Sequence, residues 1–371
     1  MSLTPEQVAK PLKISKRIQE TPDAVSLVLE IPRELKSLFR YQAGQFVSFF
    51  LTIDGETISR SYSLSCSPLI DVEFKITVKK VPGGKGSTYL CDQAKEGDIL
   101  LTTPPAGHFF KPVMAEGLHY LLFAAGSGIT PVYSIMKTVL EASPLNRVTL
   151  VYCNRNEEGI IYRTELEGWL KKHDGRLEIV HTLTKPSSSW KGNCGRLNDA
   201  LAQQVIDKAL AQKLPLDCYM CGPTDFMNSI KSVLEKNQVP KERIHIEDFG
   251  IAIHKAAAKT GPDVKQHWTF IGPDKETGTP EKLIVQLNGE TIEVAAVAGQ
   301  NIVETLLQAG AQPPYSCLDG ACMACMGKIQ EGRVYQEDPG ILTDDNIANC
   351  ESLTCQAKPL SRIVKVSYDN L

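Results

Sequence analysis

The sequence predicts three domains in series: an antiparallel β-barrel, an α/β domain with a parallel sheet, and a small α+β domain. The length of 371 residues exceeds that of one ordinary domain. Strand-like patterns dominate before Pro104, whereas strands and helices alternate after Gly107. A stretch without sustained periodicity, 251–280, then precedes an acidic C-terminal part. The predicted domains are therefore 1–113, 114–250 and 281–371, with 251–280 as a linker.

Each domain is predicted from short local patterns. In the first, 45–51 is rich in Phe and Val and 72–79 alternates apolar and polar residues, as strands of an antiparallel sheet do. The middle part reads as a doubly wound parallel sheet. Its expected strands are 120–125, 148–152, 177–181 and 217–220, with a helix at 132–140. In the last part, Asn288-Gly289 predicts a hairpin turn between strands 283–287 and 291–294, and 302–309 reads as a helix.

Composition excludes several classes of protein. The chain is 42% hydrophobic and 22% charged, as globular proteins are, and its net charge of −3 gives no overall signature of nucleic-acid binding. No apolar run reaches the ~18 residues of a membrane span, and the first ten residues do not resemble a signal peptide. We therefore expect a cytoplasmic protein with no membrane partner. Eleven cysteines, an odd number, favour reduced thiols over a disulfide framework.

The C-terminal part carries the strongest chemical signal. Cys317, Cys322 and Cys325 follow the spacing C-x4-C-x2-C, and Cys355 lies further along the chain. This spacing matches the four thiolates of a plant-type [2Fe-2S] cluster, in which a short loop curls around the cluster with its N–H groups toward the sulfurs. A structural zinc site is the alternative, but the segment has one C-x2-C pair and no histidine. We expect Cys350 to pack rather than to bind metal.

Two motifs in the first part suggest a flavin site. The segment Arg60-Ser61-Tyr62-Ser63 offers a cation for a phosphate, an aromatic face for a ring and a hydroxyl for a ring nitrogen. The segment Gly84-Lys85-Gly86-Ser87 lets backbone amides approach a pyrophosphate, although a plain hairpin turn is the alternative.

The middle part offers a dinucleotide site. A glycine turn with Gly126, Gly128, Thr130 and Pro131 lies between a strand and a helix, where amides can face a pyrophosphate. The segment Cys221-Gly222-Pro223 follows another strand, so its thiol is a candidate to line the nicotinamide pocket. Because they lie three apart on a strand, Cys218 and Cys221 are expected to point to opposite faces.

The segments 315–328 and 353–357 resemble plant-type ferredoxins, which implies a β-grasp fold for the last domain. The motifs together resemble the ferredoxin-NADP reductase family, in the order found in fused reductase components of bacterial oxygenases such as phenylacetyl-CoA epoxidase and ketosteroid hydroxylase. The resemblance implies that Arg60 holds the flavin pyrophosphate, Tyr62 packs on the ring and Ser63 approaches its N5 atom. Gly86 and Ser87 would complete the phosphate cradle.

The cofactors follow from these motifs with two choices open. The Ser87 loop and the turn at Gly107 favour FAD, with FMN as the alternative. Asn154 and Arg155 lie where a 2′-phosphate would bind, but the motif also fits users of NADH, so NADPH and NADH both stay open. The resemblance also makes Phe249 a candidate to lie beside the flavin, with a plain core residue as the alternative.

The resulting hypothesis is an NAD(P)H-dependent reductase. Nicotinamide gives two electrons as a hydride and the cluster takes one at a time, so a flavin has to stand between them. Ser63 and Cys221 would shape the hydride geometry, with no side-chain general base. The expected partner is a terminal oxygenase or another electron-accepting protein. A redox-sensing or regulatory subunit, a reductase of another acceptor and a zinc-stabilised binding module are the alternatives.

Overall fold

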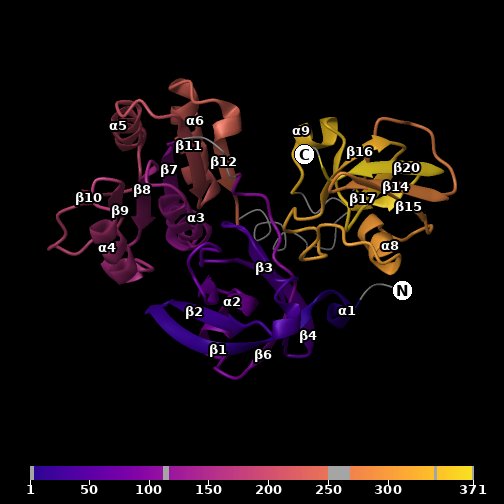
Figure 1. Cartoon of the computed structure of the whole chain (residues 1–371), viewed down its shortest axis with the longest axis horizontal. Helices are drawn as coiled ribbons and strands as arrows, with labels where there is room; N and C mark the ends of the chain where they lie inside the picture. Colours follow the sequence, from indigo (N-terminus) through magenta and orange to yellow (C-terminus); the bar gives the residue numbers. More distant parts are fainter. Residues whose placement is uncertain (1–3, 112–116, 250–267, 338–340, 370–371) are drawn as a thin grey trace.

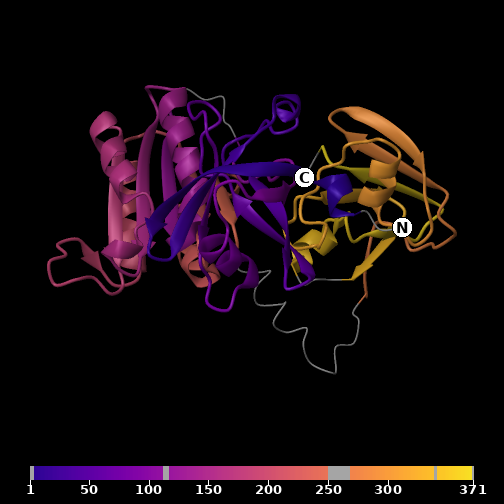
Figure 2. The ribbon, with the colours of Figure 1, turned by 90° about the horizontal axis from the view of Figure 1, so that it is seen from below.

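The computed structural model describes residues 4–111, 117–249, 268–337 and 341–369. Figure 1 shows three domains, and Figure 2 shows the same arrangement from a perpendicular direction. In both views the first domain lies between the other two. Among the described residues, no helix combines the length and the apolar character that crossing a bilayer requires.

The first domain is a closed antiparallel barrel, as predicted. Its strands follow the order β4-β3-β6-β1-β2-β5. They are β1 (Lys10–Thr21), β2 (Ala24–Glu30), β3 (Phe46–Ile53), β4 (Glu56–Ser63), β5 (Phe74–Lys79) and β6 (Ile99–Thr102). A bridge between Leu64 and Ile76 joins the end of β4 to β5 and so closes the barrel. The short helices α1 (Pro5–Val8) and α2 (Lys85–Asp92) flank it.

The second domain is the predicted α/β unit. Its parallel strands follow the order β10-β9-β8-β7-β11-β12. They are β7 (His119–Ala125), β8 (Arg147–Asn154), β9 (Leu177–Leu183), β10 (Asn193–Cys194), β11 (Leu216–Cys221) and β12 (Ile244–Glu247). Its helices are α3 (Ile129–Ala142), α4 (Arg163–Lys172), α5 (Asp199–Leu210) and α6 (Thr224–Lys236). Apolar clusters cover both faces of the sheet, and Cys218 packs in one while Cys221 packs in the other, as expected.

The third domain is an α+β unit with two sheets. The larger follows the order β15-β14-β20-β16-β18 and the smaller β13-β17-β19. The strands are β13 (Trp268–Ile271), β14 (Lys282–Leu287), β15 (Glu290–Ala295), β16 (Met326–Glu331), β17 (Val334–Glu337), β18 (Glu351–Leu353), β19 (Lys358–Pro359) and β20 (Ile363–Ser367). Helices α8 (Ile302–Gln308) and α9 (Asp344–Ala348) complete it. At the predicted hairpin turn, Asn288 and Gly289 both have positive φ, as a type I′ turn requires.

The structure differs from the predicted linker in one place. Within 251–280, β13 forms an antiparallel pair with β17 of the third domain. The strand is short and lies at the edge of its sheet, so its order comes from pairing with residues far along the chain rather than from a local pattern. Residues 251–267 and the predicted boundaries after 113 and 250 lie outside or at the edge of the described residues.

The first two domains share a partly polar junction. Ser134 donates a hydrogen bond to the carbonyl oxygen of Cys66, and the hydroxyls of Ser67 and Thr138 lie 2.7 Å apart. The buried ammonium of Lys137 pairs with the carboxylate of Asp71 across the same junction. These contacts fix the barrel against α3, and therefore fix the two halves of a site that uses both domains.

Candidate functional site

The predicted flavin motif lies on β4, at the side of the barrel that faces α2. The exposed Arg60 and the half-buried Tyr62 lie near the first turn of α2, and the ring of Tyr62 packs 5.7 Å from the ring of Phe49. Ser63, at the end of β4, is 4% exposed. Burial raises the pKa of Tyr62 well above its ordinary value, so its hydroxyl stays neutral.

Glycine is required where α2 meets this strand. A Cβ atom on Gly86 would lie 2.9 Å from Cγ of Arg60 and 3.4 Å from the hydroxyl of Tyr62. The first amides of α2 have no partner within the helix, and such helix N-termini attract phosphate groups. The structure therefore brings the predicted Gly84–Ser87 loop and the arginine of the motif together, as a flavin pyrophosphate site needs.

Two side chains of this loop have partners within the chain. Lys85 forms an exposed ion pair with Glu56, with 2.6 Å between Nζ and Oε2. The hydroxyl of Ser87 accepts a hydrogen bond from the Val81 amide and donates one to the carbonyl oxygen of Gly84. Ser87 therefore fixes the shape of the turn, and the donors left for a phosphate are backbone amides.

The predicted nucleotide motifs meet at the carboxyl edge of the parallel sheet. A Cβ atom on Gly128 would lie 2.1 Å from the carbonyl oxygen of Cys221, so the turn after β7 touches the end of β11 directly. Gly222 is equally confined, because its Cβ atom would lie 2.9 Å from both Ala125 and Phe226. Ligands bind at this edge in open α/β sheets.

Buried polar atoms without partners lie along the same edge. Both side-chain amide atoms of Asn154, at the end of β8, are buried without a hydrogen-bond partner in the structure. Oε2 of Glu247, at the end of β12, is likewise buried without a hydrogen-bond partner in the structure. Burial raises the pKa of Glu247 to about 8, so its carboxyl group is mostly protonated at neutral pH and can donate a hydrogen bond. No role was assigned to Glu247 from the sequence alone. Its position at the end of a parallel strand, where ligands bind in open α/β sheets, is the feature that could have identified it.

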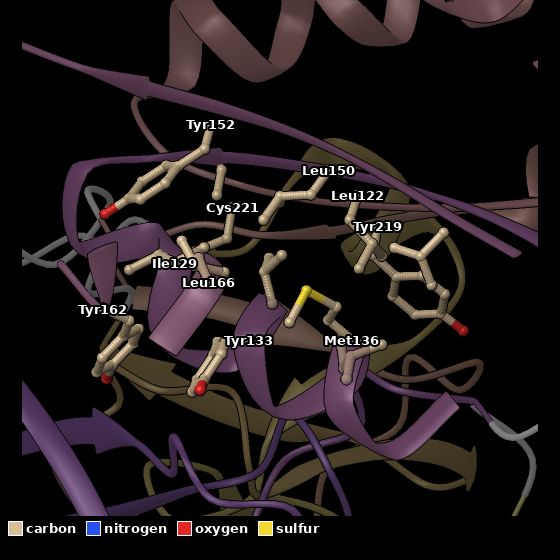
Figure 3. Packing of buried hydrophobic residues seen from close by; sticks show 14 of the residues in the cluster. Leu122, Ile129, Tyr133, Met136, Leu150, Tyr152, Tyr162, Leu166, Tyr219 and Cys221 are labelled. Atoms are coloured by element: carbon tan, nitrogen blue, oxygen red, sulfur yellow. The ribbon is translucent and has the colours of Figure 1, made fainter. Parts of the chain in front are cut away.

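Cys221 is paired in register with Glu247, but its thiol points into the protein. It is 0% exposed and lies in the apolar cluster with Ile129 and Tyr152 (Figure 3). Burial raises the pKa of this thiol well above its ordinary value, so it is neutral. In this structure Cys221 supports the sheet edge by packing, and its carbonyl oxygen is covered by Gly128.

The other predicted residues of this site differ in exposure. Thr130 is buried and donates a hydrogen bond to the carbonyl oxygen of Ser127, and Pro131 is buried beside it. Arg155 and Pro223 are exposed. Phe249 is 37% exposed just after β12, so it is not a core residue.

The four predicted cluster ligands lie together as two pairs. The thiol of Cys317 interacts most strongly with Cys322, and that of Cys325 with Cys355. No three His, Cys, Asp or Glu side chains of the described residues gather as ligands of a single ion. Two thiolates for each of two irons is the requirement of a [2Fe-2S] cluster, so the donor set fits that group. Cys350 is partly buried and packs against the apolar core of this domain, in line with the expectation that it packs.

Backbone N–H groups converge on these sulfurs. The amides of Asp319 and Ala321 donate to Sγ of Cys317 at 3.4 and 3.3 Å, and the amide of Cys317 donates to Sγ of Cys322 at 3.5 Å. A hydrogen bond with Cys322 and the amides of Asp319 and Ala321 lower the pKa of Cys317 to about 7, whereas the contact with Cys317 raises the pKa of Cys322 well above its ordinary value. The converging amides therefore favour a thiolate at Cys317.

The cluster loop packs directly on the barrel. Ala324 is buried against Phe46 and Ala106, and Cys322 packs on the same group. Phe46 is the register partner of Ser63 on β4. The strand β3, which carries Phe46, therefore lies between a predicted cluster ligand and the predicted flavin motif.

Three family models match the chain in this order. They are an oxidoreductase FAD-binding domain over residues 11–110, an oxidoreductase NAD-binding domain over 122–232 and a 2Fe-2S iron-sulfur cluster binding domain over 285–360. These matches confirm the predicted cofactors: FAD, a nicotinamide dinucleotide and a [2Fe-2S] cluster.

Relatives and solved structures agree over nearly the whole chain. It is 33% identical over 361 residues to the 3-ketosteroid-9-alpha-monooxygenase, ferredoxin reductase component, of Rhodococcus rhodochrous, with 96% of each chain covered. It is 29% identical to one of the subunits of 1,2-phenylacetyl-CoA epoxidase from Escherichia coli (strain K12), over 96% of this chain and 97% of the relative. The structure of phthalate dioxygenase reductase has the same fold, with a TM-score of 0.57, 24% identity, and 98% and 100% of the chains covered. The chain therefore belongs to the family of NAD(P)H-dependent reductase components that join an FAD-binding, an NAD-binding and a 2Fe-2S domain in one polypeptide.

Proposed function

We propose that this chain is the reductase component of an oxygenase system and delivers single electrons from NAD(P)H to a terminal oxygenase. The observation that carries the proposal is the packing of a predicted cluster ligand, Cys322, on Phe46 and Ala106 of the flavin barrel. The barrel also contacts the nucleotide domain through α3. One domain thus adjoins both the electron donor and the cluster, as a relay from a two-electron donor to a one-electron carrier requires.

We assign the flavin-binding roles to residues around β4 and α2. Arg60 and the first amides of α2 hold the pyrophosphate, because a guanidinium and a helix N-terminus both favour phosphate. Tyr62 packs on the ring, and Ser63 places a hydroxyl near its N5 atom. The ring, when bound, takes up a hydride and releases its electrons singly.

At the sheet edge we assign the nucleotide pyrophosphate to the Gly126–Pro131 turn and the nicotinamide to the Cys221–Pro223 segment. The unpartnered amide of Asn154 and the protonated carboxyl of Glu247 supply polar contacts at either side. Arg155 faces solvent beside Asn154, where it can meet the adenosine end of either nucleotide. Phe249 covers the flavin side of this edge. The packing of Gly128 on Cys221 fixes the shape of this sheet edge. Residues at the edge therefore position the nicotinamide, and the reaction uses no side-chain general base.

The acceptor is proposed to approach the third domain. Residues 281–371 include 6 basic and 12 acidic residues, whereas the rest of the chain carries a small positive excess. A partner with a basic face is therefore favoured, and charge complementarity of this kind speeds encounter. The names of the two relatives make an oxygenase the natural acceptor.

The test is turnover with a one-electron acceptor. Purified protein should sustain NADH- or NADPH-driven reduction of cytochrome c, and Cys355→Ser should lose this activity while its flavin is still reduced by the nucleotide. The matched control is Cys350→Ser, which changes a partly buried cysteine that packs against the core of the same domain. A chain that holds all cofactors but cannot turn over would instead support a redox-sensing role.

Two further assignments complete the proposal. We retain domain boundaries after residues 113 and 250, since the FAD-binding model ends at 110, the NAD-binding model spans 122–232 and the 2Fe-2S model begins at 285. We place the protein in the cytoplasm, where the nucleotide is supplied and where the cysteines of a cluster loop stay reduced.

A further inference from the structure

The two residues before the first cluster ligand extend from the third domain and form hydrogen bonds with the first domain. Ser316 is 1% exposed, and its Oγ lies 2.7 Å from Oγ of Ser48 and 3.1 Å from Oγ1 of Thr103. The hydroxyl of Tyr315 donates a hydrogen bond, at 3.2 Å, to the carbonyl oxygen of Val8. These contacts join residues more than two hundred positions apart.

The barrel holds its two hydroxyls ready for this contact. Ser48 and Thr103 are both 0% exposed, and the amide of Ser48 donates to Oγ1 of Thr103 at 2.9 Å. Oγ of Ser48 also lies 2.7 Å from Oγ of Ser61, in the flavin motif. A chain of hydroxyls therefore runs from the residue beside Cys317 to the strand that carries Tyr62 and Ser63.

The chemistry of this contact suits a defined but reversible docking. Each hydroxyl has one proton and two lone pairs, so the network fixes direction as well as distance. A buried hydroxyl without a partner is costly, whereas water satisfies it after separation. The apolar part of the contact is the small group of Phe46, Ala106 and Ala324. Hydroxyls thus specify one position of the loop without a large apolar surface that would hold it there permanently.

We propose that Ser316 is a positioning residue, which docks the cluster loop on the barrel through Ser48 and Thr103 and so sets the rate of electron transfer from flavin to cluster. The inference rests on the proposed function. In that step one electron leaves the reduced flavin and one ferric iron of the cluster becomes ferrous. The second electron follows after the acceptor has reoxidised the cluster.

The test compares Ser316→Ala with Ser352→Ala in the full-length holoenzyme at equal iron and flavin content. Ser352 is a buried serine of the same domain, and its hydroxyl donates at 2.7 Å to Gln336 without reaching the barrel. In anaerobic stopped-flow experiments, Ser316→Ala should reduce its flavin at the wild-type rate but its cluster roughly tenfold more slowly, since two hydrogen bonds are lost. Ser352→Ala should leave both rates unchanged.

Hydrogen exchange gives a readout that does not depend on electron transfer. Exchange in peptides 44–50 and 311–318 should be roughly tenfold faster in Ser316→Ala than in wild type and unaltered in Ser352→Ala. Equal exchange and equal cluster-reduction rates in Ser316→Ala and wild type would overturn the proposal, and so would the same changes in both variants. If wild-type protein cannot reduce its cluster with either nucleotide, the proposed function fails, while exchange still reports the docking.

A second pair of variants leaves the cluster loop untouched. Thr103→Val keeps the shape of the side chain but removes its hydroxyl, and Thr103→Ser keeps the hydroxyl. Slow cluster reduction and fast exchange at 311–318 in Thr103→Val, with near-wild-type values in Thr103→Ser, would support the proposal. The same defect in both variants would contradict it, because loss of the methyl group alone would then be sufficient.

Discussion

Gly128→Ala should separate the two nucleotide-binding segments. In the structure the added Cβ atom would lie 2.1 Å from the carbonyl oxygen and 2.6 Å from the carbonyl carbon of Cys221. Both are backbone atoms of a buried strand, so no side-chain rotation relieves the contact. The turn must move by about 1 Å, and overpacking of this kind typically costs about 1–3 kcal/mol. Because φ of Gly128 is −60°, alanine adds no backbone strain, and the effect is purely steric.

This displacement should affect both stability and nucleotide binding. We expect thermal unfolding of the nucleotide domain about 5 °C lower. Loss of alignment of backbone amides with a pyrophosphate should raise the Kd of NAD(P)H about tenfold. Calorimetry and flavin-reduction rates at varied nucleotide concentration measure the two effects.

The control is Gly168→Ala, in the interior of α4. No atom lies within 4 Å of the position of its added Cβ. Alanine there should stabilise the helix by up to about 1 kcal/mol and leave nucleotide binding unchanged. If Gly128→Ala matches wild type in both measurements, the turn does not pack on β11 as described.

The remaining predictions concern the reaction and its pH and salt dependence. Ser63→Ala should slow flavin reduction about tenfold while FAD stays bound, and Cys221→Ala should likewise slow this step more than it raises the nucleotide Kd; unaltered stopped-flow rates would contradict either role. Burial raises the pKa of Glu247 from 4.5 to about 8. Between these two pH values, its carboxyl group therefore keeps its proton in the folded state but has lost it in the unfolded state. The free energy of unfolding of wild type, relative to that of Glu247→Gln, should therefore fall by roughly 1.4 kcal/mol per pH unit as pH rises through this window. The same pH dependence of the unfolding free energy in both proteins would refute the assignment. Electron delivery to the acceptor should weaken as ionic strength rises, because the third domain is acidic; a salt-independent rate would exclude electrostatic docking.

Local patterns in the sequence predicted most of the fold. Four of the six parallel strands and α3 formed where apolar runs and the glycine turn placed them, whereas the short strands β10 and β12 were not predicted. Asn288-Gly289 formed the expected turn. The four candidate ligands could be named from the sequence because one short loop supplies three of them at fixed spacing, and backbone amides converge on Cys317 as expected.

Long-range contacts were not predictable in this way. No local pattern indicates that Ser316 meets Ser48, because each reads as a polar residue until the two domains are placed. The same holds for β13, whose order depends on β17. The ion pair of Lys85 with Glu56, which lies on another element, likewise has no local signal. Buried Glu247 likewise depends on its neighbours in space for its raised pKa.

The central claim is that one chain carries electrons from nicotinamide through flavin to an iron-sulfur cluster. The most direct measurement is the visible spectrum of purified protein before and after anaerobic addition of NADH or NADPH, with iron, zinc and flavin assayed in the same sample. We predict FAD and iron without zinc, and bleaching first of the flavin bands and then of the cluster absorbance. A colourless zinc protein, or a flavin that is reduced while an intact cluster stays oxidised, would contradict the claim.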